Sequence, residues 1–131
     1  MEYTTKQITV RYSETDQMHF VHHSNYLKYF ELARLEWLSD LGISYAKMER
    51  EGILMPVVSV GVNYKTPLYF GDTFCVKVTL KQLPKATLDF EYLIVNQNDE
   101  LICKGHTKLA FLSPQSQRPM RCPDFLAEKF N

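Results

Sequence analysis

The chain has 131 residues, of which 45% are hydrophobic and 13% aromatic, and its 15 Lys and Arg balance its 15 Asp and Glu to a formal net charge of zero. At roughly 150 residues per domain, this length predicts one domain spanning residues 1–131. The composition excludes a disordered chain. The zero net charge excludes nucleic-acid binding through bulk positive charge. Because no run of about 18 consecutive apolar residues occurs, we expect no membrane-spanning helix.

The N-terminal residues lack the basic and then apolar stretches of a signal peptide, so we expect a cytoplasmic protein. From residue 5 to 12 polar and apolar residues alternate, with Ile8, Val10 and Tyr12 on one face. A period of two predicts a half-buried strand. Residues 13–23 follow without a clear period.

A helical period begins at Ser24 and continues to Leu41, which predicts one long helix. Its apolar stripe contains Tyr26, Phe30, Ala33, Trp37 and Leu41, widened by Leu27, Leu35 and Leu38. Ser24 or Asn25 can cap the start of the helix, and Gly42 stands where a left-handed residue can end it. So wide a stripe indicates that the helix is enclosed by a larger element.

Charged residues on the same helix are spaced for ion pairs, because Glu31 lies three residues from both Lys28 and Arg34. A shorter helix is expected over residues 44–51, before Gly52.

The rest of the chain predicts strands. Alternating residues occupy the ranges 58–64, 74–80, 88–94 and 101–112, and a last short helix is expected over 124–130. The short breaks between these strands favour antiparallel neighbours. The three cysteines, Cys75, Cys103 and Cys122, form no CxxC pair and are interpreted as small hydrophobic residues rather than as disulfide or zinc ligands.

This order of elements predicts an α+β fold in which a five-stranded antiparallel sheet wraps around the helix of residues 24–41. Such a sheet has open edges, and an open edge can pair with a second copy of the chain. We therefore expect a homo-oligomer, at least a dimer.

The segment from Arg11 to Tyr26 joins the first strand to the start of the long helix and carries the most reactive side chains. Unpaired backbone N–H groups and the helix dipole can stabilise a developing oxyanion at such a helix start. Asp16 precedes the helix, and His22 and His23 lie beside it. A carboxylate, an imidazole and oriented amides together indicate an acyl-transfer site.

Simpler interpretations of these residues stay open. Aspartate is common in turns, so Asp16 can also be explained as a turn residue without a catalytic role. His19, His22 and His23 are close enough in sequence to suggest a metal site, but the further ligands that such sites need are missing, so we expect no metal. His106, on the last strand, is expected to be a surface or core histidine.

Several stretches of the chain resemble a known family. They are residues 12–18 (YSETDQM), 21–26 (VHHSNY), 29–34 (YFELAR), 64–67 (YKTP) and 71–72 (GD). These stretches resemble the signature of the 4-hydroxybenzoyl-CoA thioesterase family, and most of all its YbgC-like acyl-CoA thioesterases. The resemblance covers nearly the whole chain and implies a hotdog fold and hydrolysis of an acyl-CoA, or a related acyl thioester, to a free acid and a thiol. It implies no cofactor, since a thiolate is a good leaving group.

One position departs from the family pattern, which usually has glycine where this chain has His19. A side chain makes a positive φ less accessible than glycine does. We expect the extra imidazole to narrow or polarise the pocket, which affects the substrate range more than the chemistry.

The resemblance also implies roles for the matched residues. Asp16 would attack the thioester carbon or activate a water as a general base, and His23 would orient the substrate or the water. Tyr12 would lie at the pocket wall, as a third residue of the catalytic group. The backbone amides of His22, His23 and Ser24 would form the oxyanion hole.

Substrate binding would involve His19, Asn25, Lys65 and Thr66. Lys85 and Lys104 are further candidates, with Lys65, for the phosphates of CoA, although each lysine is also simply explained as a solvated strand-end residue. The resemblance implies a homodimer or homotetramer with the site at the subunit interface, where the second copy completes the acyl pocket.

A function of a different class stays open, because a non-catalytic module that binds an acyl thioester or a lipid can have the same fold. The Asp16 and His23 pair favours the enzyme. A hotdog dehydratase would place its catalytic groups within the helix, where Glu31 is the only comparable carboxylate, and pairing with Lys28 or Arg34 is the simpler role for Glu31.

Overall fold

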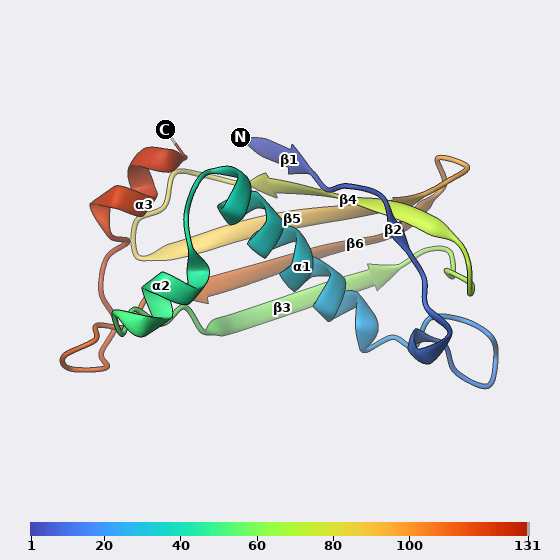
Figure 1. Ribbon diagram of the computed structural model, residues 1–131, viewed down its shortest axis with the longest axis horizontal. Helices are drawn as coiled ribbons and strands as arrows, with labels where there is room; N and C mark the ends of the chain where they lie inside the picture. The colour runs from blue at the N-terminus through green and yellow to red at the C-terminus, as the bar shows by residue number, and fades with distance from the viewer. Residues whose placement is uncertain (131) are drawn as a thin grey trace.

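The helix α1, Asn25–Asp40, lies diagonally across one face of an antiparallel sheet (Figure 1). This computed structural model describes residues 1–130. The predicted helix is confirmed, and Gly42 follows it with a φ of 80°, in the left-handed region. Most of the predicted stripe is buried, but Leu27 and Leu35 are exposed because the sheet covers only one side of the helix.

The sheet has the strand order β1-β4-β5-β6-β3, with β2 also paired to β4. The strands are β1 Glu2–Thr4, β2 Ile8–Thr9, β3 Val57–Tyr64, β4 Thr73–Leu80, β5 Thr87–Asn96 and β6 Leu101–Ala110. Two short helices, α2 Tyr45–Arg50 and α3 Asp124–Lys129, lie where the sequence predicts them. The α+β prediction with five strand positions is confirmed, except that two short strands share the first position.

The predicted strand over residues 5–12 is wrong in its extent. The chain leaves the sheet after Thr9, and Tyr12 begins a 3₁₀ turn, Tyr12–Glu14, where its side chain is 73% exposed. The cause is local, because the backbone N–H of Arg11 donates to the Glu14 carboxylate at 2.8 Å and not to another strand.

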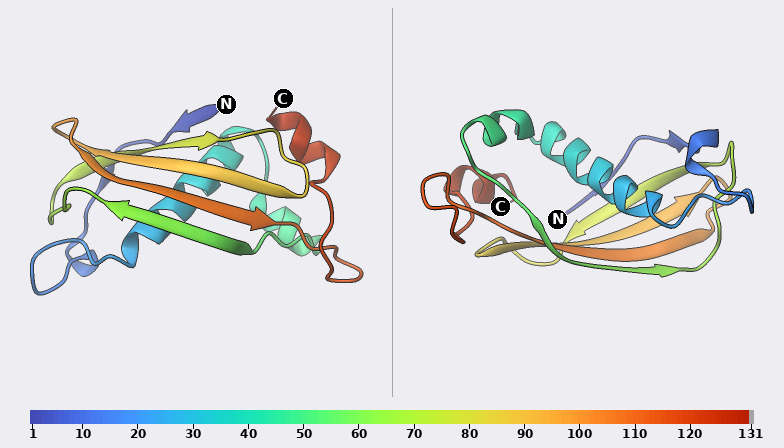
Figure 2. Two further views of the ribbon diagram at one scale, coloured as in Figure 1. Left: turned by 180° about the vertical axis from the view of Figure 1, so that it is seen from behind. Right: turned by 90° about the horizontal axis from the view of Figure 1, so that it is seen from below.

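The strand β3 forms an uncovered edge of the sheet (Figure 2). A register shift between Val57 and Ser59 leaves Val58 out of the alternation that the sequence predicts. Val57, Val58, Val60 and Tyr64 are each about half exposed, at 46, 57, 46 and 50%. An edge strand with this many exposed apolar side chains can pair with another strand.

The contact between α1 and the sheet centres on Phe30, which is fully buried. Its ring stacks on Tyr92 with centroids 4.3 Å apart and lies against Gly105, where a Cβ atom would overlap it. Because successive residues of a strand face opposite sides of a sheet, Lys104 and His106 lie on the uncovered face seen in Figure 2. His106 is therefore a surface residue, and its ring lies over Gly61.

The predicted ion pairs along α1 are wrong. Within residues 1–130 no ion pair joins Glu31 to Lys28 or Arg34. The guanidinium of Arg34 instead donates to the hydroxyl of Tyr92 at 3.1 Å, which in turn lies 2.6 Å from the Thr107 hydroxyl. A buried hydroxyl therefore draws Arg34 toward the sheet.

The three cysteines are free thiols. Cys103 and Cys122 are buried and Cys75 is half-buried. Burial raises the pKa of Cys103 to about 12 and that of Cys122 to about 11, so both stay protonated near neutral pH. This agrees with their interpretation as packing residues.

We expect Gly105→Ala to destabilise the fold, because the new methyl group must displace the Phe30 ring from its stack on Tyr92. Overpacking of this kind costs about 1–3 kcal/mol of unfolding free energy, which urea denaturation measures. The matched test repeats the substitution in a Phe30→Leu background. If Gly105→Ala costs as much there as in the wild type, the contact is not the cause.

Candidate active site

Residues 14–24, called the α1 loop below, form a small closed hairpin that leads into α1. Thr15 pairs with Val21 in an antiparallel bridge, and the N–H of Asp16 donates to the carbonyl of Phe20 at 2.9 Å. The N–H of His19 donates to the carbonyl of Asp16, also at 2.9 Å. These bonds place Asp16 at the base of a tight, exposed tip.

One oxygen of the Asp16 carboxylate accepts a hydrogen bond from the loop itself. Its Oδ1 accepts the backbone N–H of Met18 at 2.9 Å, which is the geometry of a turn residue. Its Oδ2 makes no hydrogen bond within the described residues, and the side chain is exposed. Asp16 is therefore a turn residue that also offers one free carboxylate oxygen.

His19 has a φ of 68°, in the left-handed region that glycine favours. The expectation that its side chain makes this conformation less accessible is not met here, and histidine is among the residue types enriched at positive φ. The loop therefore has a path suited to glycine and carries an exposed imidazole beside Asp16.

Glu14 holds the α1 loop onto the start of the helix. Its backbone carbonyl accepts two hydrogen bonds of 2.8 Å, from the N–H of His22 and from the side-chain amide of Asn25. Asn25 is buried and its side-chain N–H is used here, so in this structure it supports the loop, and the substrate-binding role that the resemblance implies stays a prediction.

The same hydrogen bonds reduce the number of backbone N–H groups that are free to form the predicted oxyanion hole. The N–H of His22 is occupied by Glu14, and the N–H of Ser24 donates weakly, at 3.2 Å, to Nδ1 of His22. The N–H of His23 makes no hydrogen bond within residues 1–130. Of the three predicted donors, that of His23 is free, that of Ser24 is loosely held, and that of His22 is unavailable in this conformation.

Neither predicted helix cap is formed. Ser24 occupies the cap position but makes no side-chain cap bond, because its hydroxyl lies 2.8 Å from Nδ1 of His22. The first two amides of α1, those of Asn25 and Tyr26, donate instead to the backbone carbonyls of His22 and His23, at 2.9 and 3.4 Å. No side chain caps the start of α1, where the helix dipole is positive.

The other predicted residues are only partly brought together. His22 and His23 are exposed, and the centroids of their rings are 4.1 Å apart. Lys65 and Thr66 are held by the sheet, because their backbone N–H groups both donate to the carbonyl of Ile102. Tyr64, the residue before Lys65, reaches the carbonyl of His23 at 3.1 Å, so residues 64–66 lie at this end of the molecule.

Two of the three candidate lysines lie elsewhere. Lys104 is on the face of the sheet opposite α1. Lys85 is in the turn between β4 and β5, beside α3 and at the far end of the sheet from the α1 loop (Figure 1). Lys65 is the candidate that remains at the end of the molecule where the α1 loop lies, since Tyr64 beside it contacts His23.

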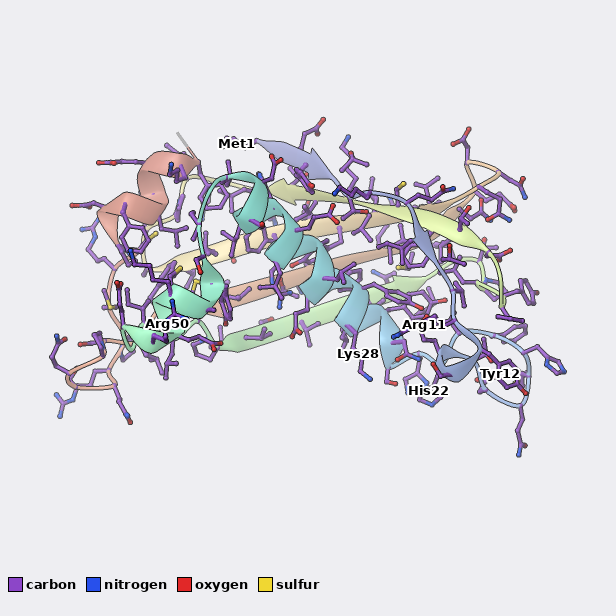
Figure 3. The ribbon with its side chains drawn as sticks, viewed as in Figure 1. Met1, Arg11, Tyr12, His22, Lys28 and Arg50 are labelled. Carbon is purple, nitrogen blue, oxygen red and sulfur yellow. The ribbon has the colours of Figure 1, made fainter. Side chains whose placement is uncertain are left out.

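Aromatic side chains surround the α1 loop, and the sequence analysis missed most of them. Tyr12 packs edge-on against Phe70 with centroids 5.6 Å apart, and Phe20 packs on Tyr69 at 5.4 Å. Figure 3 shows Arg11, Tyr12 and His22 at the same end of the molecule. The sequence pattern that could have identified these aromatic residues is the pair Tyr69 and Phe70, which directly precedes Gly71 and Asp72.

A cavity of about 350 Å³ lies between α1, α2 and the sheet, toward the other end of β3. Its lining includes Glu31, Arg34, Leu35, Tyr45, Glu49 and Val57. These residues come from separate elements, so no local pattern identified them. Within residues 1–130, no group of three or more His, Cys, Asp or Glu side chains is placed to hold a metal ion, and no helix is long and apolar enough to cross a membrane.

Comparisons with known proteins agree with the resemblance. Residues 10–130 match the model of the Thioesterase-like superfamily. A Bacillus subtilis (strain 168) protein, provisionally named acyl-CoA thioesterase YneP, is 36% identical over 121 residues, covering 92% of this chain and 88% of the relative. The acyl-CoA thioester hydrolase YbgC of Escherichia coli O6:H1 is 24% identical over 123 residues, 94% of this chain and 92% of the relative. The crystal structure of a DHNA-CoA thioesterase from Staphylococcus aureus superposes with a TM-score of 0.90 at 35% identity, covering 98% of this chain and 88% of that one.

We expect Asn25→Ala to loosen the α1 loop and to lower the unfolding free energy by about 0.5–1.5 kcal/mol, the usual net contribution of one hydrogen bond, since the Glu14 carbonyl keeps its bond from His22. Asn63→Ala is the control, since Asn63 is exposed on β3 and makes no side-chain hydrogen bond within residues 1–130. Thermal or urea unfolding measures both. Unchanged stability together with a raised KM would show that Asn25 faces the substrate after all.

Proposed function

The chain belongs to the thioesterase-like superfamily and has its hotdog fold, and we propose that it hydrolyses acyl-CoA thioesters at the α1 loop. The observation that carries this proposal is the free Oδ2 of Asp16 on the same short loop as the free N–H of His23. A carboxylate can supply the base or nucleophile for thioester hydrolysis, and an open amide at a helix start can stabilise the oxyanion. The names of its relatives support the same reaction.

The chemistry of the step follows from these groups. Asp16 either attacks the thioester carbon or removes a proton from the attacking water. In both cases the carbonyl oxygen becomes negative, and the His23 amide, supported by the helix dipole, stabilises it. The carbon–sulfur bond then breaks, and CoA leaves as a thiolate that takes up a proton. If water attacked, the free acid is formed in this step. If Asp16 attacked, the acyl group is left as an anhydride with the Asp16 carboxylate, and a water hydrolyses it to the free acid and restores Asp16. One such amide donor is worth about 3–4 kcal/mol of barrier in comparable sites.

We propose that the working enzyme is at least a dimer paired along β3. The exposed valines of this edge and the exposed Leu27 and Leu35 of α1 together form an apolar border that a second copy would cover. An antiparallel pair of β3 strands related by a two-fold axis places the end of each strand beside the start of the other.

This pairing explains why the cavity lies far from Asp16 of its own chain. The α1 loop contacts the end of β3 through Tyr64, whereas the cavity is lined by Val57 at the start of β3. In the proposed dimer the α1 loop of the second copy therefore lies beside the cavity. We propose that each cavity holds the acyl group of a thioester bound at the other copy's Asp16, with Lys65 near the phosphates of CoA.

A non-catalytic module that binds acyl thioesters remains the alternative. The free carboxylate oxygen favours hydrolysis, because a carboxylate can act as nucleophile or general base, whereas a binding module needs neither. We also propose that the protein acts in the cytoplasm.

We expect Asp16→Asn to lower kcat by at least about a hundredfold while the fold remains intact, because the amide can neither attack the carbon nor accept a proton. The measurement is free-thiol release from a panel of short-chain, long-chain and aromatic acyl-CoAs. The control is Asp99→Asn, which changes an aspartate in the turn between β5 and β6.

Two outcomes would contradict this account of Asp16. Wild-type rates from Asp16→Asn would remove the aspartate from the mechanism. A wild-type protein that binds acyl-CoA but releases no thiol from any member of the panel would establish the binding module instead.

We expect Val60→Lys to separate the dimer and to lower activity, because pairing along β3 would bury the new charge at the interface. Val60 is 46% exposed in the single chain, so the lysine is tolerated there. Light scattering measures the oligomeric state, and Ser59→Lys, on the opposite face of the same strand, is the control. A wild-type protein that is strictly monomeric would exclude the shared site.

A further inference from the structure

Tyr64, the last residue of β3, connects the edge of the sheet to the α1 loop. Its hydroxyl donates to the backbone carbonyl of His23 at 3.1 Å, across 41 positions of sequence. Its ring packs edge-on against Tyr26 in the first turn of α1, with centroids 5.1 Å apart. The tyrosine thus contacts both the loop and the helix that the loop enters.

The bond from Tyr64 is the shorter of the two contacts that hold the His23 carbonyl. The other donor is the N–H of Tyr26, at 3.4 Å. This carbonyl shares its peptide plane with the N–H of Ser24, so the bond fixes the direction of that N–H. Hydrogen bonds in series polarise one another, which makes the Ser24 N–H a stronger donor.

The Tyr64 hydroxyl keeps its proton under ordinary conditions. Burial, and to a lesser extent the nearby Cys103 thiol, raises the pKa of Tyr64. A protonated phenol can donate to a carbonyl, whereas a phenolate cannot. The contact with His23 therefore persists over the pH range in which thioester hydrolysis would be measured.

We propose that Tyr64 is a positioning residue that sets the orientation of the His23–Ser24 peptide for catalysis. The inference rests on the proposed function, since it assumes that the α1 loop carries out the hydrolysis. Tyr64 acts through His23 and does not itself contact the reacting atoms.

The position of Tyr64 also connects catalysis with the edge strand. Tyr64 is 50% exposed on β3, the strand along which we propose that two copies pair. Covering this edge would restrict the tyrosine side chain and favour the rotamer that reaches His23. Assembly of the dimer would thereby stabilise the active arrangement of the α1 loop.

The test is Tyr64→Phe, which keeps the ring against Tyr26 and removes only the hydroxyl. We expect kcat to fall about tenfold with KM changed less than about twofold, because the lost bond orients the Ser24 N–H, the loosely held member of the predicted oxyanion donors, which would assist the His23 N–H in the transition state. Light scattering and thermal unfolding verify that assembly and stability are retained. The backbone amide resonance of Ser24, followed by NMR, is expected to shift, since the carbonyl of the same peptide loses its hydrogen-bond donor.

Tyr3→Phe is the matched control, because the Tyr3 hydroxyl donates to the Glu36 carboxylate at 2.9 Å, away from the α1 loop. It loses one tyrosine hydrogen bond and is expected to leave kcat and the Ser24 amide resonance unchanged. An active wild type with an equally active Tyr64→Phe and an unmoved Ser24 resonance would overturn the inference alone. A wild type that hydrolyses no acyl-CoA would overturn the proposed function instead.

Discussion

The structure depends on how closely α1 approaches the sheet, and one missing side chain makes that approach possible. Gly105 on β6 leaves room for the Phe30 ring, which then stacks flat on Tyr92 of the adjacent strand. This contact fixes the height of the helix above the sheet and its diagonal direction (Figure 1). The start of α1, and with it the α1 loop, consequently extends beyond the sheet toward the end of β3.

The two ends of β3 have different roles, and this division explains why the candidate site looks incomplete in one chain. The end of the strand supports the α1 loop through Tyr64, and its start lines a cavity that Asp16 of the same chain does not approach. In the proposed dimer, pairing of two edges would join the complementary halves. A single interaction surface can thus build two equivalent sites, which is a common outcome of two-fold symmetry.

The sequence predicts well what depends on short-range periodicity and poorly what depends on distant contacts. The helix of residues 24–41 and the strands after residue 57 follow from their apolar periods. The predicted strand over 5–12 is too long because the carboxylate of Glu14, three residues ahead, accepts the Arg11 N–H. The bond from Asn25 to the Glu14 carbonyl could not be predicted, because it joins residues 11 positions apart through the backbone of one of them. The resemblance locates the α1 loop, but only the hydrogen bonds distinguish the free amide of His23 from the occupied amide of His22.

His19 shows that the path of the main chain and the chemistry of the loop tip can vary independently. Its backbone is left-handed, as a glycine in that place would be, and the turn is closed by main-chain bonds that any residue can make. The exposed side chain is consequently added at the tip of the loop that carries Asp16, while the main chain keeps the path of the turn. Position 19 is therefore a place where evolution or an engineer can exchange one side chain for another without rebuilding the turn.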